Sequence, residues 1–125
     1  MESFEILYNF PFSSERKRMG ILLKDNQTNK YFFYLKGADI VIRKKVSTED
    51  RLFVDEESYN LSVEGLRTLV LCYREISNEE FQNFDTQMKQ AGQNLQKRDL
   101  LERKAINTLE KDMILLGISG VEDLL

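Results

Sequence analysis

Histidine is absent from this 125-residue sequence, and cysteine and proline each occur only once. Without histidine, the chain has no imidazole to serve as a catalytic base or as a metal ligand. The single cysteine, Cys72, excludes an internal disulfide framework and a zinc site made of several cysteines, and it fits a reducing compartment. Because Cys72 stands in the apolar run Leu69–Tyr73, we expect it to be a small buried hydrophobic residue.

Long hydrophobic runs and a strong excess of charge are also lacking. No apolar segment approaches the length of a membrane-spanning helix, and no signal peptide is visible. The 18 basic and 21 acidic residues give a net charge of -3, which argues against bulk attraction to nucleic acid or to an anionic membrane. A nucleotide site would therefore need a local cluster of positive residues. The hydrophobic content of 42% is enough for the core of one domain.

Three strands are predicted at the start of the chain, at about residues 4–10, 18–24 and 30–35. In the first strand, apolar and polar residues alternate, and Pro11 follows it, which favours a sheet edge or a bend. The third strand contains the aromatic run Tyr31–Leu35, which we interpret as buried on both faces. The short polar connections between these strands predict an antiparallel meander.

Helices and two further strands are predicted for the rest of the chain. Ser47–Asp50 and Ser77–Glu80 are helix start signals, the second being a capping box, and Gly65 fits the position just past a helix end. The expected elements are a short helix at 38–45, a helix at 53–64, a strand at 67–73 and a helix with an apolar stripe at Phe81, Phe84, Met88, Ala91 and Leu95. They are followed by a helix through Leu101, Ala105 and Leu109, a strand at 113–116 and a loop at 117–120. The predicted fold class is α+β, a mostly antiparallel β-sheet with helices packed against it.

Lys36 and Gly37 directly follow the aromatic strand. A cation at a strand end, next to a glycine that lets a ligand approach the backbone, is a plausible anion site. On its own this pair is more typical of an ordinary strand that ends at a turn.

A second group of candidates consists of Phe12, the basic run Arg16–Arg18 and Arg67. An aromatic side chain beside cations can stack on a base, although Phe12 can equally be a core residue. If the basic run is a strand, Lys17 faces away from both arginines, so the three cannot serve one pocket, and a solvated charged edge is the alternative. Arg67 lies between Leu66 and Leu69 and suits a bidentate phosphate contact, or else an ion pair with a carboxylate. We find no catalytic acid/base pair, Walker loop, nucleophile elbow or metal-ligand spacing.

Four blocks of the sequence together resemble the nucleotide-binding (N) domain of P-type ATPases. They are Phe12–Met19, Lys36–Asp39, Gly65–Leu69 and Leu115–Asp123, and their order and spacing match over nearly the whole chain. The forms Lys-Gly-Ala-Asp, Arg-Lys-Arg-Met and Gly-Leu-Arg-Thr-Leu are similar to those of the phospholipid-translocating branch, the flippases. Cation pumps more often have proline in place of Asp39. An N domain of a cation pump, or a nucleic-acid or protein interaction module that uses the basic edge, stays open as an alternative.

The resemblance implies an ATP site. Phe12 would stack on the adenine, Lys36 would line the deep, adenine end of the pocket, Lys17 would lie nearer the phosphates, and Arg67 would hold the phosphate tail. Three further residues are candidate contacts: Ser14, Gly37 and Thr68.

The resemblance also implies a larger parent protein. In such pumps this domain presents the γ-phosphate of ATP to an aspartate of another domain, with Mg²⁺ bound mainly by that domain, and the cycle drives phospholipid movement. The Asp-Lys-Thr-Gly motif of that aspartate, every membrane helix and the acidic segment that normally precedes Phe4 are absent from this sequence. We therefore expect a cytosolic fragment of an integral membrane protein, monomeric and without ATP turnover of its own. Residues 1–116 would be a partial nucleotide-binding domain, and residues 117–125 a hinge toward the phosphorylation domain.

Overall fold

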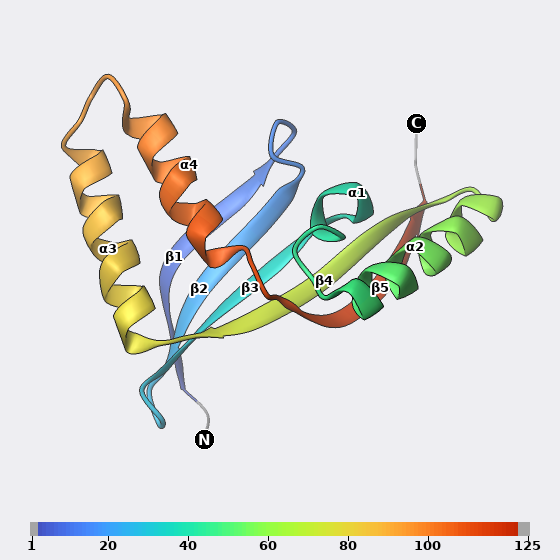
Figure 1. The fold of residues 1–125 in the computed structure, drawn as a ribbon, viewed down its shortest axis with the longest axis horizontal. Helices are drawn as coiled ribbons and strands as arrows, with labels where there is room; N and C mark the ends of the chain where they lie inside the picture. The colour runs from blue at the N-terminus through green and yellow to red at the C-terminus, as the bar shows by residue number, and fades with distance from the viewer. Residues whose placement is uncertain (1–2, 123–125) are drawn as a thin grey trace.

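The computed structural model describes residues 3–122, which form one antiparallel sheet and the helices packed on it (Figure 1). The strands are β1 (Phe4–Ser13), β2 (Arg18–Asp25), β3 (Lys30–Ala38), β4 (Leu66–Ile76) and β5 (Ile114–Glu122). The helices are α1 (Asp39–Ile42), α2 (Thr48–Val63), α3 (Asn78–Gly92) and α4 (Arg98–Leu109). The α+β prediction is confirmed.

The sheet is a meander in which strand order follows chain order, β1-β2-β3-β4-β5. All four neighbouring pairs are antiparallel, as predicted for the first three strands. Local chemistry explains the β2–β3 turn, since the Asp25 carboxylate accepts hydrogen bonds from the Gln27 amide at 3.0 Å and the Thr28 hydroxyl at 3.0 Å. Asn29 closes the turn at a φ of 58°, a left-handed conformation that asparagine tolerates well. Pro11 lies in β1, an edge strand, as expected.

One face of the sheet carries the core. Phe33 and Leu35 of β3 and Cys72 of β4 are at most 1% exposed, and Phe84 of α3 and Val54 of α2 close over this face. The opposite face is open to solvent in part, because Phe32 and Tyr34 are only half-buried. The prediction that β3 is buried on both faces is therefore wrong. Cross-strand pairs of aromatic side chains stabilise a sheet. On this face the Tyr34 ring of β3 stacks on the Tyr73 ring of β4, with the ring centroids 5.7 Å apart.

The predicted helix signals form as expected. The Ser77 hydroxyl accepts a hydrogen bond from the Glu80 amide and the Glu80 carboxylate accepts one from the Ser77 amide, which completes the capping box. Gly65 adopts a φ of +77° just after α2. The apolar stripe of α3 is shorter than predicted, because the helix ends at Gly92 and Leu95 is 89% exposed in the following loop.

The loop predicted at residues 117–120 is instead part of β5. This strand pairs along β4 from Leu66↔Glu122 to Tyr73↔Ile114, with one irregularity near Leu71. Gly120 suits the crowded packing against α2, since a Cβ at this position would lie 2.8 Å from Leu61 Cδ2. The expected domain of residues 1–116 and hinge of residues 117–125 remains a prediction, with 117–122 in β5 and 123–125 outside the described residues.

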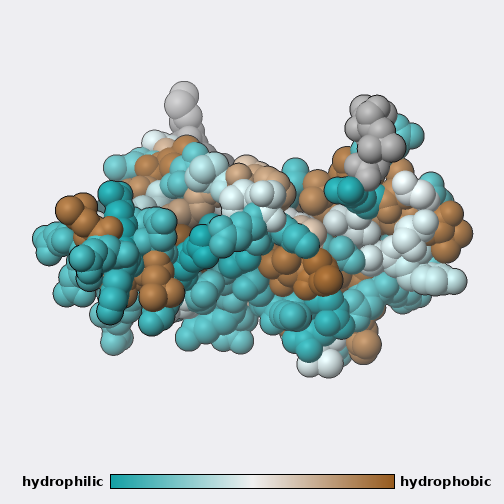
Figure 2. Space-filling view, turned by 90° about the horizontal axis from the view of Figure 1, so that it is seen from above, coloured by the Kyte–Doolittle hydropathy of each residue, from teal (hydrophilic) through white to brown (hydrophobic). Residues whose placement is uncertain are grey.

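The face of the molecule seen from above Figure 1 is mostly hydrophilic (Figure 2). Figure 2, a view from above Figure 1, shows hydrophobic side chains as separate patches among hydrophilic ones. Within residues 3–122, no helix is long and apolar enough to cross a membrane.

The buried position of Cys72 predicts an unreactive thiol. Its side chain is fully buried, and burial, together with the negative charge of Glu110, raises the pKa of the thiol to about 12. At pH 8 almost no thiolate is present in the folded protein, so we expect no reaction with a thiol reagent until denaturant unfolds the chain. Above pH 9 the unfolded chain ionises first, so this group lowers stability as pH rises from about 9 to 12. Rapid labelling of the folded protein at pH 8 would contradict the packing.

Candidate functional site

A cavity of about 730 Å³ lies where β3 ends and β4 begins. This volume is in the usual range for small-molecule sites, about 300–1,000 Å³. The walls come from β1 and the β1–β2 turn on one side, from α1 and α2 on another, and from the start of β4. The lining residues are Phe12, Ser14, Lys17, Ala38, Asp39, Ile40, Ser58, Ser62, Leu66, Arg67, Thr68 and Leu69.

Five of the seven predicted site residues line this one cavity: Phe12, Ser14, Lys17, Arg67 and Thr68. Phe12 is 59% exposed, so the alternative that it belongs to the core is wrong. Thr68 is buried and faces the core side of β4, whereas Arg67 is exposed on the opposite side of the same strand. The structure therefore places an accessible aromatic ring and two cationic side chains around a common space.

Lys36 lies outside the lining of this cavity. It pairs with Met19 on β2 and Leu71 on β4, and it lines a shallow hollow of about 170 Å³ on the open face of the sheet. Side chains two residues apart on a strand share a face, so Lys36 is on the same side as Ala38, which does line the cavity. The hollow is thus next to the cavity along β3.

Gly37 is buried, and its environment differs from the one expected for it. A Cβ at this position would meet the Arg18 Cβ at 2.7 Å and the Lys17 carbonyl oxygen at 2.7 Å. The β1–β2 turn therefore packs against the Gly37 backbone, where a ligand was expected to approach. The absence of a side chain allows the Ala38 amide to donate to the Lys17 carbonyl at 3.2 Å.

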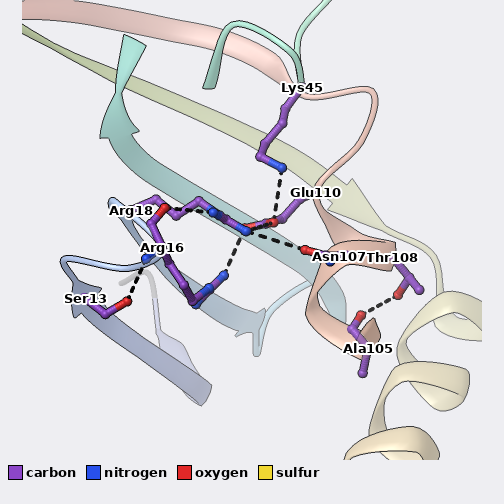
Figure 3. A network of polar contacts seen from close by, with 8 residues as sticks. All are labelled: Ser13, Arg16, Arg18, Lys45, Ala105, Asn107, Thr108 and Glu110. Atoms are coloured by element: carbon purple, nitrogen blue, oxygen red, sulfur yellow. Dashed lines mark hydrogen bonds and ion pairs between the residues drawn. The ribbon is translucent and has the colours of Figure 1, made fainter. Parts of the chain in front are cut away.

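The β1–β2 turn is held by a buried ion cluster (Figure 3). The Glu110 carboxylate, with 0% of its side chain exposed, accepts from Arg18 Nε at 2.7 Å and from Arg18 Nη2 at 2.8 Å. Arg16 Nη2 lies 3.3 Å from the same carboxylate, and Lys45 Nζ lies 3.3 Å from its second oxygen. Burial and the neighbouring charge of Arg18 lower the pKa of the Arg16 guanidinium.

The basic run is thus divided between two tasks. Arg16 and Arg18 point to Glu110, which corrects the alternative of a solvated charged edge, while Lys17 lines the cavity. The expectation that the three cations cannot share one pocket is borne out, but the reason is the turn between β1 and β2 and not the alternation of side chains along a strand. Lys17 sits in a turn with a φ of 57°, and its amide donates to the Ser13 carbonyl at 2.7 Å.

Sequence reasoning missed several residues of this region. Asp39 and Ser58 line the cavity and are hydrogen-bonded to each other, the Ser58 hydroxyl donating to Asp39 Oδ2. In the sequence analysis Asp39 belongs to the Lys36–Asp39 block and to the expected helix at 38–45 without a role in the site, and no local pattern marks Ser58. Glu110 directly follows α4, and no local pattern marks this carboxylate as buried, because its partner Arg18 is 92 residues away in sequence.

The chemistry of the cavity suits binding of an aromatic anion. A flat ring can stack on Phe12, and Lys17 and Arg67 can approach an anionic group. Among residues 3–122 no group of three or more histidine, cysteine, aspartate or glutamate residues is placed to hold a metal ion.

The whole chain, residues 1–125, matches the family described as "P-type ATPase, cytoplasmic domain N". The chain belongs to this family. The chain is also similar to a segment of several much longer proteins. It is 42% identical over 118 residues to the probable phospholipid-transporting ATPase IIB of Bos taurus, covering 94% of this chain and 10% of the relative.

Two further relatives agree. The phospholipid-transporting ATPase NEO1 of Saccharomyces cerevisiae is 40% identical over 122 residues, which cover 97% of this chain and 10% of NEO1. The probable phospholipid-transporting ATPase tat-5 of Caenorhabditis elegans is 42% identical over 124 residues, 98% of this chain and 11% of that protein. The resemblance to flippases predicted from the four blocks is confirmed. This domain N spans about a tenth of the length of these relatives.

The close approach at Gly37 generates a stability prediction. We expect Gly37→Ala to lower the free energy of unfolding by about 1–3 kcal/mol, because the added methyl group meets backbone atoms that cannot rotate away. Gly117→Ala is the matched control, since Gly117 also lies in a strand and has nothing within 4 Å of a built Cβ. Urea unfolding of both variants measures the difference; equal stabilities would show that the turn can move away from β3.

Proposed function

We propose that the cavity at the end of β3 and the start of β4 binds ATP. The observation that carries the proposal is the convergence of Phe12, Lys17 and Arg67, from three separate segments, on one space of nucleotide size. An exposed phenylalanine supplies a stacking surface worth about 1–3 kcal/mol per base. Lysine and arginine supply charge-assisted hydrogen bonds to phosphate oxygens.

The proposed roles are those that the resemblance to P-type ATPase N domains implies. Phe12 stacks on the adenine, and Lys36, in the hollow beside Ala38, contacts the adenine end of the nucleotide. Lys17 lies nearer the phosphates, and Arg67 holds the phosphate tail. Ser14 and Thr68 offer hydroxyl groups to the same space, whereas Gly37 acts through the packing of the turn.

The proposed role of this domain N is to present the γ-phosphate of ATP to an aspartate in another domain of a phospholipid-translocating ATPase. The names of the relatives support this assignment. Mg²⁺ would be bound mainly by the phosphorylation domain of the parent protein, so residues 3–122 would contribute only binding and positioning of ATP. Catalysis of phosphoryl transfer depends largely on such positioning and on charge neutralisation.

The alternative of a nucleic-acid module fits the geometry poorly. Such a module would need the basic run as an exposed stripe, but Arg16 and Arg18 are engaged with Glu110. The relatives are named as phospholipid-transporting proteins, which favours that branch over a cation pump.

An NMR titration with ATP tests the proposed site. We expect amide shifts to cluster at Phe12, Lys17, Lys36, Arg67 and Thr68, with similar affinity in the presence and absence of Mg²⁺, because the adenine end dominates binding. Shifts centred on the distant α3–α4 loop, at Leu95 and its neighbours, would contradict the assignment. A silent titration of the folded protein would count against ATP as the ligand.

The stacking role of Phe12 predicts a selective loss. Phe12→Ala should weaken ATP and AMP about tenfold, as expected for a stacking contribution near 1.4 kcal/mol, while inorganic pyrophosphate binding stays the same. Phe4→Ala is the matched control, because Phe4 is an exposed phenylalanine at the other end of β1. Isothermal calorimetry gives the affinities; equal losses for ATP and pyrophosphate would refute stacking.

A further inference from the structure

Glu110 is the acidic residue at the centre of the ion cluster, and it does not line the cavity. Its two oxygens are contacted by Arg16, Arg18 and Lys45, and the side chains of these three cations are 16%, 13% and 18% exposed. A buried carboxylate is retained only where its partners compensate for lost hydration. Here the partners come from two segments: Lys45 lies between α1 and α2, and Arg16 and Arg18 directly precede and follow Lys17.

The position of Glu110 is itself fixed by the end of α4. The Arg74 guanidinium donates to the Leu109 carbonyl at 3.3 Å and to the Glu80 carboxylate at 2.8 Å. The Met113 amide donates to the Lys45 carbonyl at 2.9 Å, and Met113 forms a bridge with Val46. The carboxylate is therefore anchored in the core rather than carried by a loose connection.

The β1–β2 turn is fixed on both sides of Lys17. Arg18 binds Glu110 through two nitrogens, and its third nitrogen, Nη1, donates to the Arg16 carbonyl at 2.8 Å. Arg16 binds the same carboxylate. Both neighbours of Lys17 are thus held by the same carboxylate, and Lys17 lies between them in a left-handed conformation (φ of 57°) with its side chain lining the cavity.

We propose that Glu110 is a positioning residue for nucleotide binding: by holding Arg16 and Arg18 from the core, it orients Lys17 toward the phosphates. This inference rests on the proposed ATP site. It assigns to a carboxylate outside the cavity an effect chiefly on the phosphate end of the ligand, since the ion pairs of the cluster involve both neighbours of Lys17 and neither Phe12 nor Lys36. An ordered side chain binds more tightly because it loses less freedom on binding.

The test compares ligands with and without phosphates on the 125-residue chain. We expect Glu110→Gln to weaken ATP about tenfold by calorimetry, as for the loss of one charge-assisted contact, and to leave adenosine affinity within twofold. Lys17→Ala should weaken ATP to a similar extent, and the double variant should lose little more, because both changes remove the same contact. Glu102→Gln is the matched control: it removes a carboxylate of α4 that pairs with Arg98, away from the turn.

A second variant keeps the test decisive if Glu110→Gln does not fold. Arg18→Lys preserves the charge but loses the two-nitrogen contact with Glu110, and the same selective loss of ATP affinity is expected. An unchanged ATP affinity in a folded variant, an equal loss of adenosine, or additive losses with Lys17→Ala would each overturn the proposal.

Hydrogen exchange separates this inference from the proposed function. The Lys17 amide, bonded to the Ser13 carbonyl, should exchange at least tenfold faster in Glu110→Gln or Arg18→Lys than in Glu102→Gln. If the wild-type chain binds no ATP, the proposed function fails, and the exchange rates still report whether Glu110 holds the turn. If ATP binds but exchange at Lys17 is unchanged in the variants, the positioning role fails and the ATP site stands.

Discussion

The interaction on which the site depends is the buried contact of Glu110 with Arg16, Arg18 and Lys45. It joins the β1–β2 turn, the segment between α1 and α2, and the connection from α4 to β5. Desolvation offsets much of the attraction in such clusters, but removal of one partner leaves an uncompensated buried charge, which costs about 3–5 kcal/mol. The cluster thus adds little to net stability, and its main effect is to fix the arrangement of the segments at this end of the sheet.

In a five-stranded meander the turns between strands lie at the ends of the sheet, and the β1–β2 turn is held there by specific contacts. At this end two devices act together. Gly37 lets the Lys17 carbonyl come within hydrogen-bonding distance of the Ala38 amide, and Glu110 holds the arginines on both sides of Lys17. Backbone and side-chain contacts therefore fix the same turn from two directions. The other hairpin, β2–β3, is shaped by its own Asp25 and needs no core partner.

Local patterns predicted the elements that depend on neighbours in sequence. The capping box at Ser77 and the turn at Asp25 require only residues within a few positions, and these expectations were confirmed. The alternation expected in the first strand was not, because the register shifts between Ile6 and Tyr8 and leaves Phe4 and Ile6 50% and 61% exposed. The loop expected at residues 117–120 was wrong because glycine and serine resemble a loop locally, whereas pairing with β4 is decided by residues about 50 positions away. Glu110 was missed for the same reason, since its arginine partner lies 92 residues distant in sequence.

The placement of Lys36 shows how resemblance and geometry complement one another. Leu35 and Gly37 are buried, so alternation alone puts Lys36 on the open face, beside the cavity rather than within it. A nucleotide that reached both Phe12 and Lys36 would extend over Ala38 along this face. Its phosphates would then meet Lys17 and Arg67, and two cations balance only part of the charge of a triphosphate. Under the proposed function, in which another domain would use the bound ATP, the remaining charge would be neutralised by groups outside residues 3–122.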